Sequence, residues 1–170
     1  MGPSEWVTRC TPLIPPGPIL DVACGPGRHT RYFLGQGRPV VAIDRDVSGL
    51  ADIDDPALTS VAADLEDGSP FPVAGQQFAG VVCTNYLHRP LLPAIVAAVA
   101  SGGVLIYETF TEGHQQFGRP TRPDFLLQPG ELRAAVAGRL HVVAEEELVV
   151  PGPARVQRIC ARRPAGHDVP

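Results

Sequence analysis

The segment "ILDVACGPGRHTRYF", residues 19–33, constrains the fold more than any other part of this 170-residue chain. An apolar run ends at Cys24, and Gly25-Pro26-Gly27 leads directly into a helical pattern. A short apolar run that stops at glycine is typical of a strand buried on both faces of a parallel sheet. Glycine lets the backbone approach a ligand closely, and the start of the next helix presents free N–H groups. The segment therefore predicts an α/β fold with a ligand at the end of its first strand.

Strand and helix patterns alternate along most of the chain. The predicted strands cover residues 18–24, 38–44, 57–65, 78–85, 104–110, 140–150 and 154–163. The predicted helices cover 29–37, a short stretch at 47–53, 89–100 with Gly102 and Gly103 just past its end, and 130–138. This order predicts a Rossmann-like sheet of seven strands, mostly parallel, with an antiparallel C-terminal hairpin and helices on both faces. We expect a single domain at 1–163, followed by a flexible tail at 164–170.

Residues 111–129 interrupt this alternation. The segment contains three prolines and two glycines and shows no hydrophobic period. A loop of this length in a compact domain is usually either functional or disordered. Two aromatic residues, Phe117 and Phe125, favour an ordered loop, at least when a ligand is bound.

Composition argues against several classes of function. The formal net charge is −4 and the fourteen basic residues form no block, which argues against nucleic acid as a partner. The four cysteines are far apart, so buried free thiols are expected rather than a zinc site or a disulfide framework. No signal-peptide pattern is visible, and the longest apolar stretch, residues 90–107, is interrupted by proline, serine and glycine. We therefore expect a soluble, cytoplasmic protein without a membrane segment and without a metal site.

Three acidic residues accompany the predicted strands. Asp21 lies inside the first, where a charge is otherwise unwelcome, while Asp44 and Asp64 lie at the ends of the second and third. An acid about 20 residues after a glycine-rich turn accepts ribose hydroxyls in Rossmann-type folds. Each acid alone has a simpler interpretation, as a capping or solvent-facing group. The full dinucleotide pattern G-x-G-x-x-G is not met, because Thr30 stands at its last position.

At this point the chain resembles a known family. The motifs "LDVACGPG", "VAIDRD" and "AADLE", in this order and spacing, resemble the cofactor-binding motifs of class I S-adenosylmethionine-dependent methyltransferases. The resemblance covers roughly residues 4–162 and extends to the hairpin at the end of the fold. The stretch "GPGRHTRYFLGQGRPVVAID" further resembles the tellurite-resistance-type, small-molecule branch of that family.

The resemblance implies a cofactor, S-adenosylmethionine, and a set of residues that hold it. The glycine turn would lie against the methionine portion, Asp44 would hold both ribose hydroxyls, and Asp64 with Leu65 would flank adenine. Asp21 would help to orient the amino end of the cofactor, often through water. The full predicted cofactor set is Asp21, Ala23, Gly25, Gly27, Arg28, Asp44, Arg45, Asp64, Leu65 and Cys83.

The predicted catalytic set has four side chains, which lie at or after the ends of the fourth and fifth strands or in the following loop: Tyr86, His88, Glu108 and His114. Tyr86 would line the methyl-transfer site or simply pack at a strand end. His88 would act as a base, or be a surface histidine beside Arg89. Glu108 would form a polar wall of the pocket or face solvent, and His114 would close over the substrate.

Two arginines of the loop, Arg119 and Arg122, would recruit an anionic substrate or tie the loop to the three glutamates at 145–147. The fourth predicted strand runs into "CTNYLHRP" rather than the Asn/Asp-Pro-Pro-aromatic box of adenine and glutamine methylases. The expected function is methyl transfer from S-adenosylmethionine to a small molecule by a monomer or homodimer. Two alternatives stay open: a non-catalytic S-adenosylmethionine-binding regulatory protein, and an NAD(P)-dependent oxidoreductase.

Overall fold

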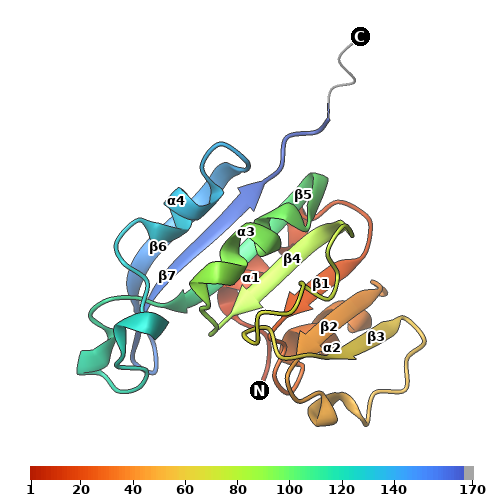
Figure 1. The fold of residues 1–170 in the computed structure, drawn as a ribbon, viewed down its shortest axis with the longest axis horizontal. Helices are drawn as coiled ribbons and strands as arrows, with labels where there is room; N and C mark the ends of the chain where they lie inside the picture. The colour runs from red at the N-terminus through yellow and green to blue at the C-terminus, as the bar shows by residue number, and fades with distance from the viewer. Residues whose placement is uncertain (167–170) are drawn as a thin grey trace.

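The protein is built around one twisted seven-stranded sheet (Figure 1). The computed structural model describes residues 1–166, and the strand order across the sheet is β3-β2-β1-β4-β5-β7-β6. The strands are β1 (Ile19–Val22), β2 (Val40–Asp44), β3 (Leu58–Ala62), β4 (Phe78–Thr84), β5 (Val99–Phe110), β6 (His141–Val150) and β7 (Ala154–Arg162). The first five are parallel, and β7 runs antiparallel to both β5 and β6. The predicted fold is confirmed.

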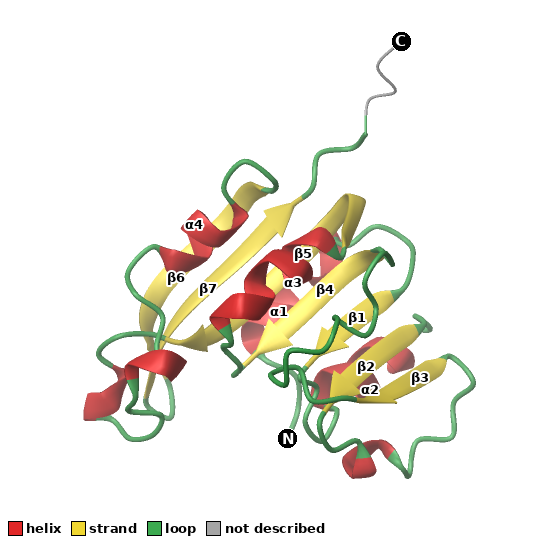
Figure 2. Cartoon of the chain, viewed as in Figure 1, coloured by secondary structure: helices red, strands yellow, loops and turns green. Residues whose placement is uncertain are grey.

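Helices cover both faces of the sheet (Figure 2). Helices α1 (Glu5–Cys10) and α2 (Arg28–Gly35) bury Trp6 and Phe33 in one apolar cluster. Helices α3 (Leu92–Ala97) and α4 (Glu131–Val136) contribute to a second cluster on the opposite face. Strand β1, an interior strand of the sheet, is buried along its whole length, which explains why its sequence is apolar except at Asp21.

Because β1, β2 and β4 are parallel neighbours, their carboxyl ends meet at one edge of the sheet. From β1 the chain adds β2 and β3 on one side of the sheet and then crosses back to add β4 and β5 on the other side. The strand order therefore switches direction at β1. Ligands of open α/β sheets bind in the crevice at such a switch point. The N-terminus and the segment 111–129 lie toward the same edge (Figure 1).

The helix predicted at 89–100 ends earlier than expected. A 3-10 turn at Arg89–Leu91 precedes α3, which stops at Ala97, and β5 already begins at Val99. The glycine pair after the predicted helix therefore lies inside β5 and does not cap a helix. The register between β4 and β5 shifts between Phe78 and Gly80, so the extra residues of β5 are accommodated as a bulge.

Other differences concern short elements. The predicted helix at 47–53 is a 3-10 turn at Ser48–Leu50, and the segment 111–129 contains two more such turns, at His114–Gln116 and Pro123–Phe125. The segment is ordered, because Leu126 and Leu127 are buried and Thr111 pairs with Leu127 in a short bridge. Of the predicted tail, residues 164–166 are exposed, and 167–170 lie outside the described residues.

The bulge in β5 generates a test of packing. A Cβ atom added at Gly103 would lie 2.8–2.9 Å from three backbone carbonyl oxygens, whereas one added at Gly35 would meet nothing within 4 Å. We expect Gly103→Ala to lower the free energy of unfolding by about 1–3 kcal/mol, measured by urea denaturation. Gly35→Ala, at the end of α2, is the control and should be neutral or slightly stabilising. Equal stabilities of the two variants would contradict the described bulge.

Candidate active site

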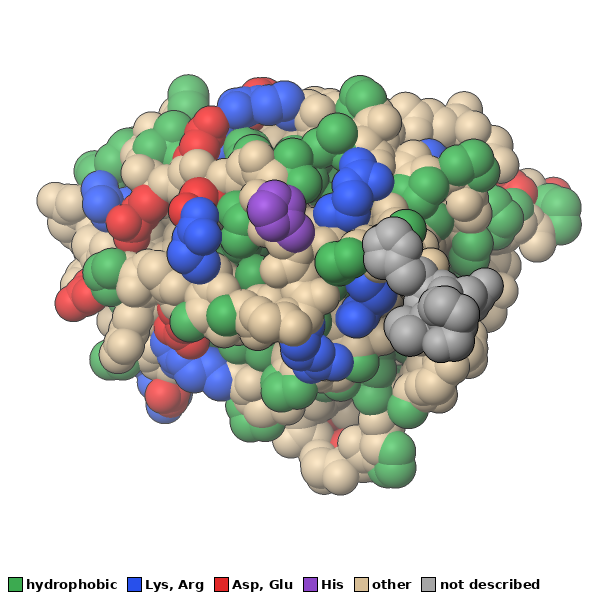
Figure 3. Space-filling model, turned by 90° about the horizontal axis from the view of Figure 1, so that it is seen from above, with side chains coloured by type: hydrophobic (Ala, Val, Ile, Leu, Met, Phe, Trp, Pro, Cys, Tyr) green, Lys and Arg blue, Asp and Glu red, His purple; other side chains and the backbone are tan. Residues whose placement is uncertain are grey.

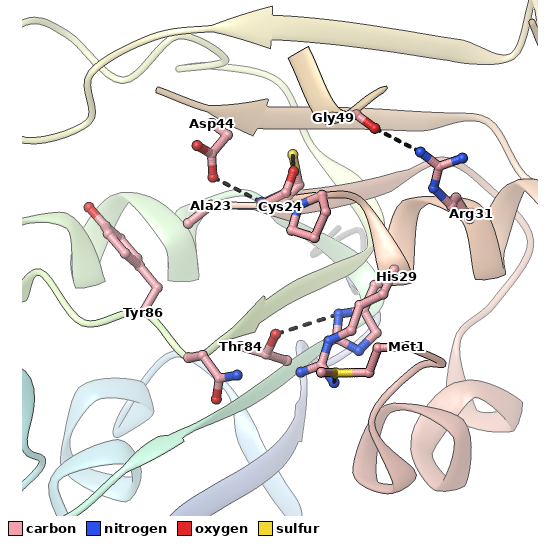
Figure 4. A pocket seen from close by; sticks show the side chains of 13 residues that line it. Met1, Ala23, Cys24, His29, Arg31, Asp44, Gly49, Thr84 and Tyr86 are labelled. Carbon is pink, nitrogen blue, oxygen red and sulfur yellow. Dashed lines mark hydrogen bonds between the residues drawn. The ribbon is translucent and has the colours of Figure 1, made fainter. Parts of the chain in front are cut away.

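A cavity of about 680 Å³ opens at the carboxyl ends of β1, β2 and β4 (Figure 4). It lies where the switch in strand order predicts a ligand. Its lining comes from the N-terminus, the turn after β1, the first residues of α2, and the ends of β2 and β4: Met1, Ala23, Cys24, Gly25, Pro26, Arg28, His29, Arg31, Asp44, Gly49, Thr84, Asn85 and Tyr86.

Two glycines shape the turn between β1 and α2 for different reasons. Gly25 has a φ of 56° and open space on its Cβ side, so the backbone there is bare toward the cavity. Gly27, with a φ of 89°, caps α2, and a Cβ atom on it would lie 2.3 Å from Leu50 Cδ2. The turn therefore needs glycine for its left-handed backbone at both positions and for close packing at the second.

The carboxylate of Asp44 is fixed at the end of β2. One oxygen accepts a hydrogen bond from the Gly25 N–H at 2.9 Å, and the other accepts from the Asp46 N–H at 3.0 Å. The contact with Gly25 is drawn in Figure 4. Each carboxylate oxygen keeps a second lone pair, so Asp44 can still accept hydrogen bonds from a ligand in the cavity.

The carboxyl of Asp21 is buried in β1, with 2% of the residue exposed. It accepts a hydrogen bond of 2.7 Å from the Thr30 hydroxyl of α2. Burial raises its pKa to about 7, against the lowering effect of the Thr30 hydrogen bond. Asp21 is not among the residues that line the cavity. It lies within the fold and ties β1 to α2.

Two non-glycine residues with left-handed backbone lie at this site. Ala23 follows β1 with a φ of 53°, and Asn85 follows β4 with a φ of 54°. Both line the main cavity. Residues held in such conformations cluster at ligand sites, because the surrounding structure must enforce them. The Asn85 N–H donates to the carbonyl of Glu108 at 2.9 Å, which joins the end of β4 to β5.

The N-terminal segment is attached to the cavity by a buried histidine. The Ser4 N–H donates to His29 Nε2 at 3.0 Å, and His29 Nδ1 lies 3.5 Å from the Thr84 hydroxyl (Figure 4). Burial, with Arg28 nearby, lowers the His29 pKa to about 4, so the ring is neutral at pH 7. Arg28 donates to the thioether of Met1 at 3.5 Å. This attachment at Met1 and Ser4 was not predicted, and a single sequence contains no local signal for it.

Two smaller cavities adjoin the main one. One, of about 340 Å³, contains the predicted residues Arg45, Asp64 and Leu65, and shares Ala23 and Asp44 with the main cavity. The other, of about 320 Å³, lies between the end of β4 and the segment 111–129. Tyr86 lines all three. Its pKa is raised by burial and by the nearby Glu66 carboxylate, so its phenol stays protonated.

The other predicted catalytic residues lie elsewhere. Glu108 accepts hydrogen bonds from the Ser4 hydroxyl at 2.7 Å and from Arg158 at 3.2 Å, and lines a different cavity of about 540 Å³. Its carboxylate belongs to an internal ion pair and does not form a wall of the main cavity. His88 faces Glu66, with 3.4 Å between Nδ1 and a carboxylate oxygen, and lines none of the three adjoining cavities.

His114 is a structural residue by its contacts. Its Nδ1 accepts from the Arg155 N–H at 3.1 Å, its Nε2 lies 2.9 Å from the Arg119 carbonyl, and the residue is 4% exposed. Both ring nitrogens are therefore engaged, which argues against closure of this ring over a substrate. Cys83 is fully buried in the core, so its thiol does not reach the predicted cofactor cavity.

The predicted link between the loop arginines and the glutamates at 145–147 is not formed among the described residues. Arg122 pairs with Asp124 of its own segment, and Arg119 is exposed. The glutamates contact arginines of other elements: Glu145 pairs with Arg133, and Glu146 pairs with Arg9 and Arg158.

The buried carboxyl of Asp21 predicts a pH dependence of stability. Its pKa of about 7 in the folded state exceeds its ordinary value of 3.8, so the folded state binds more protons between these values. The contribution of Asp21 to stability is then lost as the pH rises through this interval, whereas buried His29, with its pKa lowered to about 4, contributes in the opposite direction. In urea titrations at pH 4 to 8, Asp21→Asn should therefore gain stability with rising pH relative to the unmodified protein. Asp46→Asn, at an exposed carboxyl, is the control and should show no such gain over this interval. A pH dependence of Asp21→Asn equal to that of the unmodified protein would contradict the raised pKa of Asp21.

Comparison with known proteins places this geometry in a family. Residues 19–103, half of the 170-residue chain, match the family described as "Methyltransferase domain". The chain is similar to the malonyl-[acyl-carrier protein] O-methyltransferase of Salmonella typhimurium, with 32% identity over 101 residues, covering 56% of this chain and 39% of that protein. The chain spans about two fifths of the length of the curated relatives it matches.

Solved structures share the fold across nearly the whole chain. The 1,6-didemethyltoxoflavin-N1-methyltransferase of Burkholderia thailandensis, solved with S-adenosylhomocysteine, superposes with a TM-score of 0.67 at 22% identity, covering 94% of this chain and 76% of that chain. A TehB-like S-adenosylmethionine-dependent methyltransferase of Corynebacterium glutamicum superposes with a TM-score of 0.66 at 21% identity, covering 93% of this chain and 87% of that chain.

Proposed function

Because the chain belongs to the methyltransferase-domain family, we propose that it binds S-adenosylmethionine at the carboxyl ends of β1, β2 and β4 and methylates a small molecule. The observation that carries the proposal is the Asp44 carboxylate, held by two backbone N–H groups beside a bare glycine turn. A fixed carboxylate next to exposed backbone fits a ligand with vicinal hydroxyls and a polar amino-acid end.

The residues present fit each part of this cofactor. Asp44 would accept hydrogen bonds from the ribose, and the smaller cavity beside it, with Asp64 and Leu65, would hold adenine. The turn at Gly25 and the guanidinium of Arg28 would face the methionine portion. Arg28 lines the main cavity and uses one N–H group to bind the Met1 thioether, so its other N–H groups can donate to the carboxylate of the cofactor. Asp21, buried beneath the turn, would act through the position of β1 and α2.

When bound, S-adenosylmethionine supplies a methyl carbon on a positively charged sulfur. The acceptor's lone pair forms the new bond to this carbon while the carbon–sulfur bond breaks and its electron pair goes to sulfur. The chain has to position the acceptor in line and exclude water. Asn85 and Tyr86 are placed for this role, since they line both the main cavity and the cavity beyond β4. No side chain needs to form a covalent intermediate.

The sheet disfavours a dinucleotide-dependent oxidoreductase. The ordinary dinucleotide fold continues with parallel strands in the order 3-2-1-4-5-6. Here the antiparallel β7 stands between β5 and β6, so a second nucleotide-binding half is not formed among residues 1–166. Thr30, at the position of the third glycine, is fully buried and bonded to Asp21, and therefore has a structural role of its own.

We also propose a small-molecule acceptor rather than nucleic acid, and a protein that works in the cytoplasm as a monomer or homodimer. On the face shown in Figure 3 the arginines lie scattered among acidic and apolar side chains, without a continuous basic stripe. Several arginines are paired with carboxylates, among them Arg9, Arg31 and Arg133. None of the helices in the described part of the chain is long and apolar enough to cross a membrane.

Binding of S-adenosylhomocysteine tests the cofactor assignment. We expect Asp44→Asn to weaken binding about 10- to 100-fold by calorimetry, because hydrogen bonds to a charged acceptor are lost. The control is Asp46→Asn, two residues away and outside the cavity lining, which should bind as the unmodified protein does. Equal affinities of the two variants would show that the ribose lies elsewhere.

A thermal-shift comparison separates the proposed activity from the oxidoreductase alternative. S-adenosylhomocysteine should raise the unfolding temperature progressively as its concentration exceeds the Kd, while NADH at the same concentration should not. Stabilisation by NADH alone would refute the methyltransferase proposal. Tight binding of S-adenosylhomocysteine without turnover of labelled S-adenosylmethionine on any thiol, phenol, amine or chalcogen oxyanion would favour the regulatory alternative.

A further inference from the structure

The cavity beyond β4 has one side in common with the proposed cofactor cavity. Its volume is about 320 Å³, at the small end of the range for ligand sites. Asn85 and Tyr86 line both cavities, so a molecule that fills the smaller one lies against the contents of the larger. The remaining walls are mostly apolar and come from the end of β4, the end of β5 and the segment 111–129: Leu87, Thr109, Phe110, Pro120 and Phe125.

The outer wall of this cavity is held in place by Arg89. Its guanidinium makes two hydrogen bonds with the Glu131 carboxylate, at 2.7 and 2.9 Å, and donates to the Leu126 carbonyl at 2.8 Å. It also reaches the carbonyls of Pro123 and Asp124, both at 3.3 Å. A planar fork of donors suits this set of acceptors. The backbone around Phe125 is therefore preformed.

The other end of the wall is held by the structural histidine. His114 binds the Arg119 carbonyl, directly before Pro120, and its ring packs against Phe110 with 4.4 Å between centroids and 37° between the ring planes. Phe110, Pro120 and Phe125 thus line the cavity, and the backbone that carries Pro120 and Phe125 is anchored at both ends, by His114 and by Arg89. Flat apolar walls of this kind favour a planar acceptor.

The charge of the cavity comes from a single lining residue, Glu66. Its carboxylate accepts from the Tyr86 hydroxyl at 3.3 Å and lies 3.4 Å from His88 Nδ1. Three arginines of the surrounding elements do not line the cavity: Arg89 is bound to Glu131, Arg122 pairs with Asp124 at 3.2 Å and lies over the Phe125 ring at 5.7 Å from its centroid, and Arg119 is exposed.

From this arrangement we infer that the cavity beyond β4 takes a small planar aromatic acceptor, uncharged or cationic, which presents an N–H or O–H group to Glu66. The inference rests on the proposed methyl transfer and names its substrate class. An anionic acceptor would meet the Glu66 carboxylate with no arginine among the lining residues to compensate it, so like charge excludes it. Glu66, the last residue of the "AADLE" motif, is thereby a specificity-determining residue, a role that the motif itself did not indicate.

A matched series of three probes tests the charge preference. The probes 3-hydroxybenzylamine, 3-hydroxybenzyl alcohol and 3-hydroxybenzoate share a ring and a phenol, and differ in charge. They are titrated by calorimetry into protein saturated with S-adenosylhomocysteine, and turnover of labelled S-adenosylmethionine is followed in parallel. We expect the amine and the alcohol to bind and the benzoate to bind at least tenfold more weakly than the alcohol.

The Glu66→Gln variant tests the role of the carboxylate, and it is assayed in protein saturated with S-adenosylhomocysteine because Glu66 also lines the smaller cavity proposed for adenine. The readout is the ratio of amine affinity to alcohol affinity within the same variant, because this ratio is insensitive to any change in cofactor binding or folding. It should fall about three- to tenfold in Glu66→Gln, since a charge-assisted hydrogen bond becomes a neutral one. The control Asp67→Asn removes the next acid along the chain, which does not line the cavity, and should leave the ratio unchanged.

Three outcomes overturn the inference: tighter binding of the benzoate than of the alcohol, an unchanged ratio in Glu66→Gln, and no measurable binding of any of the three probes to the loaded protein. Affinity for S-adenosylhomocysteine is measured in the same samples and tests the proposed function separately. A protein that binds S-adenosylhomocysteine but rejects all three probes would retain the proposed function and lose this substrate class.

Discussion

The hydrogen bond between the Gly25 N–H and the Asp44 carboxylate is the contact on which the proposed site depends. It joins the turn after β1 to the end of β2 at the switch in strand order, and its donor is a backbone N–H of the turn that precedes α2. The bond fixes the carboxylate while leaving lone pairs toward the cavity. Loss of the left-handed backbone at Gly25 would misplace the donor, so the turn and the acid act as one unit.

Three buried or half-buried ion pairs, two of them made by Arg158, position the remaining walls. Arg158, 5% exposed, joins Glu108 to Glu146 and so holds β5, β7 and β6 together, while the Ser4 hydroxyl attaches the N-terminal segment to Glu108. Arg89 with Glu131 holds the segment 111–129. A buried charge that loses its partner is costly, so such pairs define one geometry even where they add little net stability. Residues that look catalytic in sequence are used here as structural ties.

A sequence prediction succeeded where it rested on a pattern of a few neighbouring residues and failed where contacts between distant residues decided the structure. The seven strands, the turn at Gly25 and Gly27, and the strand-end acid Asp44 rest on local patterns, and all are present near the predicted positions, although β5 begins at Val99 rather than at residue 104. The helix predicted at 89–100 was wrong at its end, because Val99 has partners in β4 that local propensity does not reveal. Glu108 follows the strand pattern too, but its partner Arg158 is 50 residues away, and no period or motif connects them.

The sequence by itself determined the α/β class, a mostly parallel seven-stranded sheet with an antiparallel C-terminal hairpin and the place of the glycine turn, because hydrophobic period and glycine position act over a few residues. Only the tertiary structure decided which polar side chains face a cavity. It turned Glu108 and His114 inward, brought Met1 to the cofactor cavity, and placed Glu66 beside Tyr86. The physical reason is that a side chain's hydrogen-bond partners come from distant segments, and only packing brings those segments together.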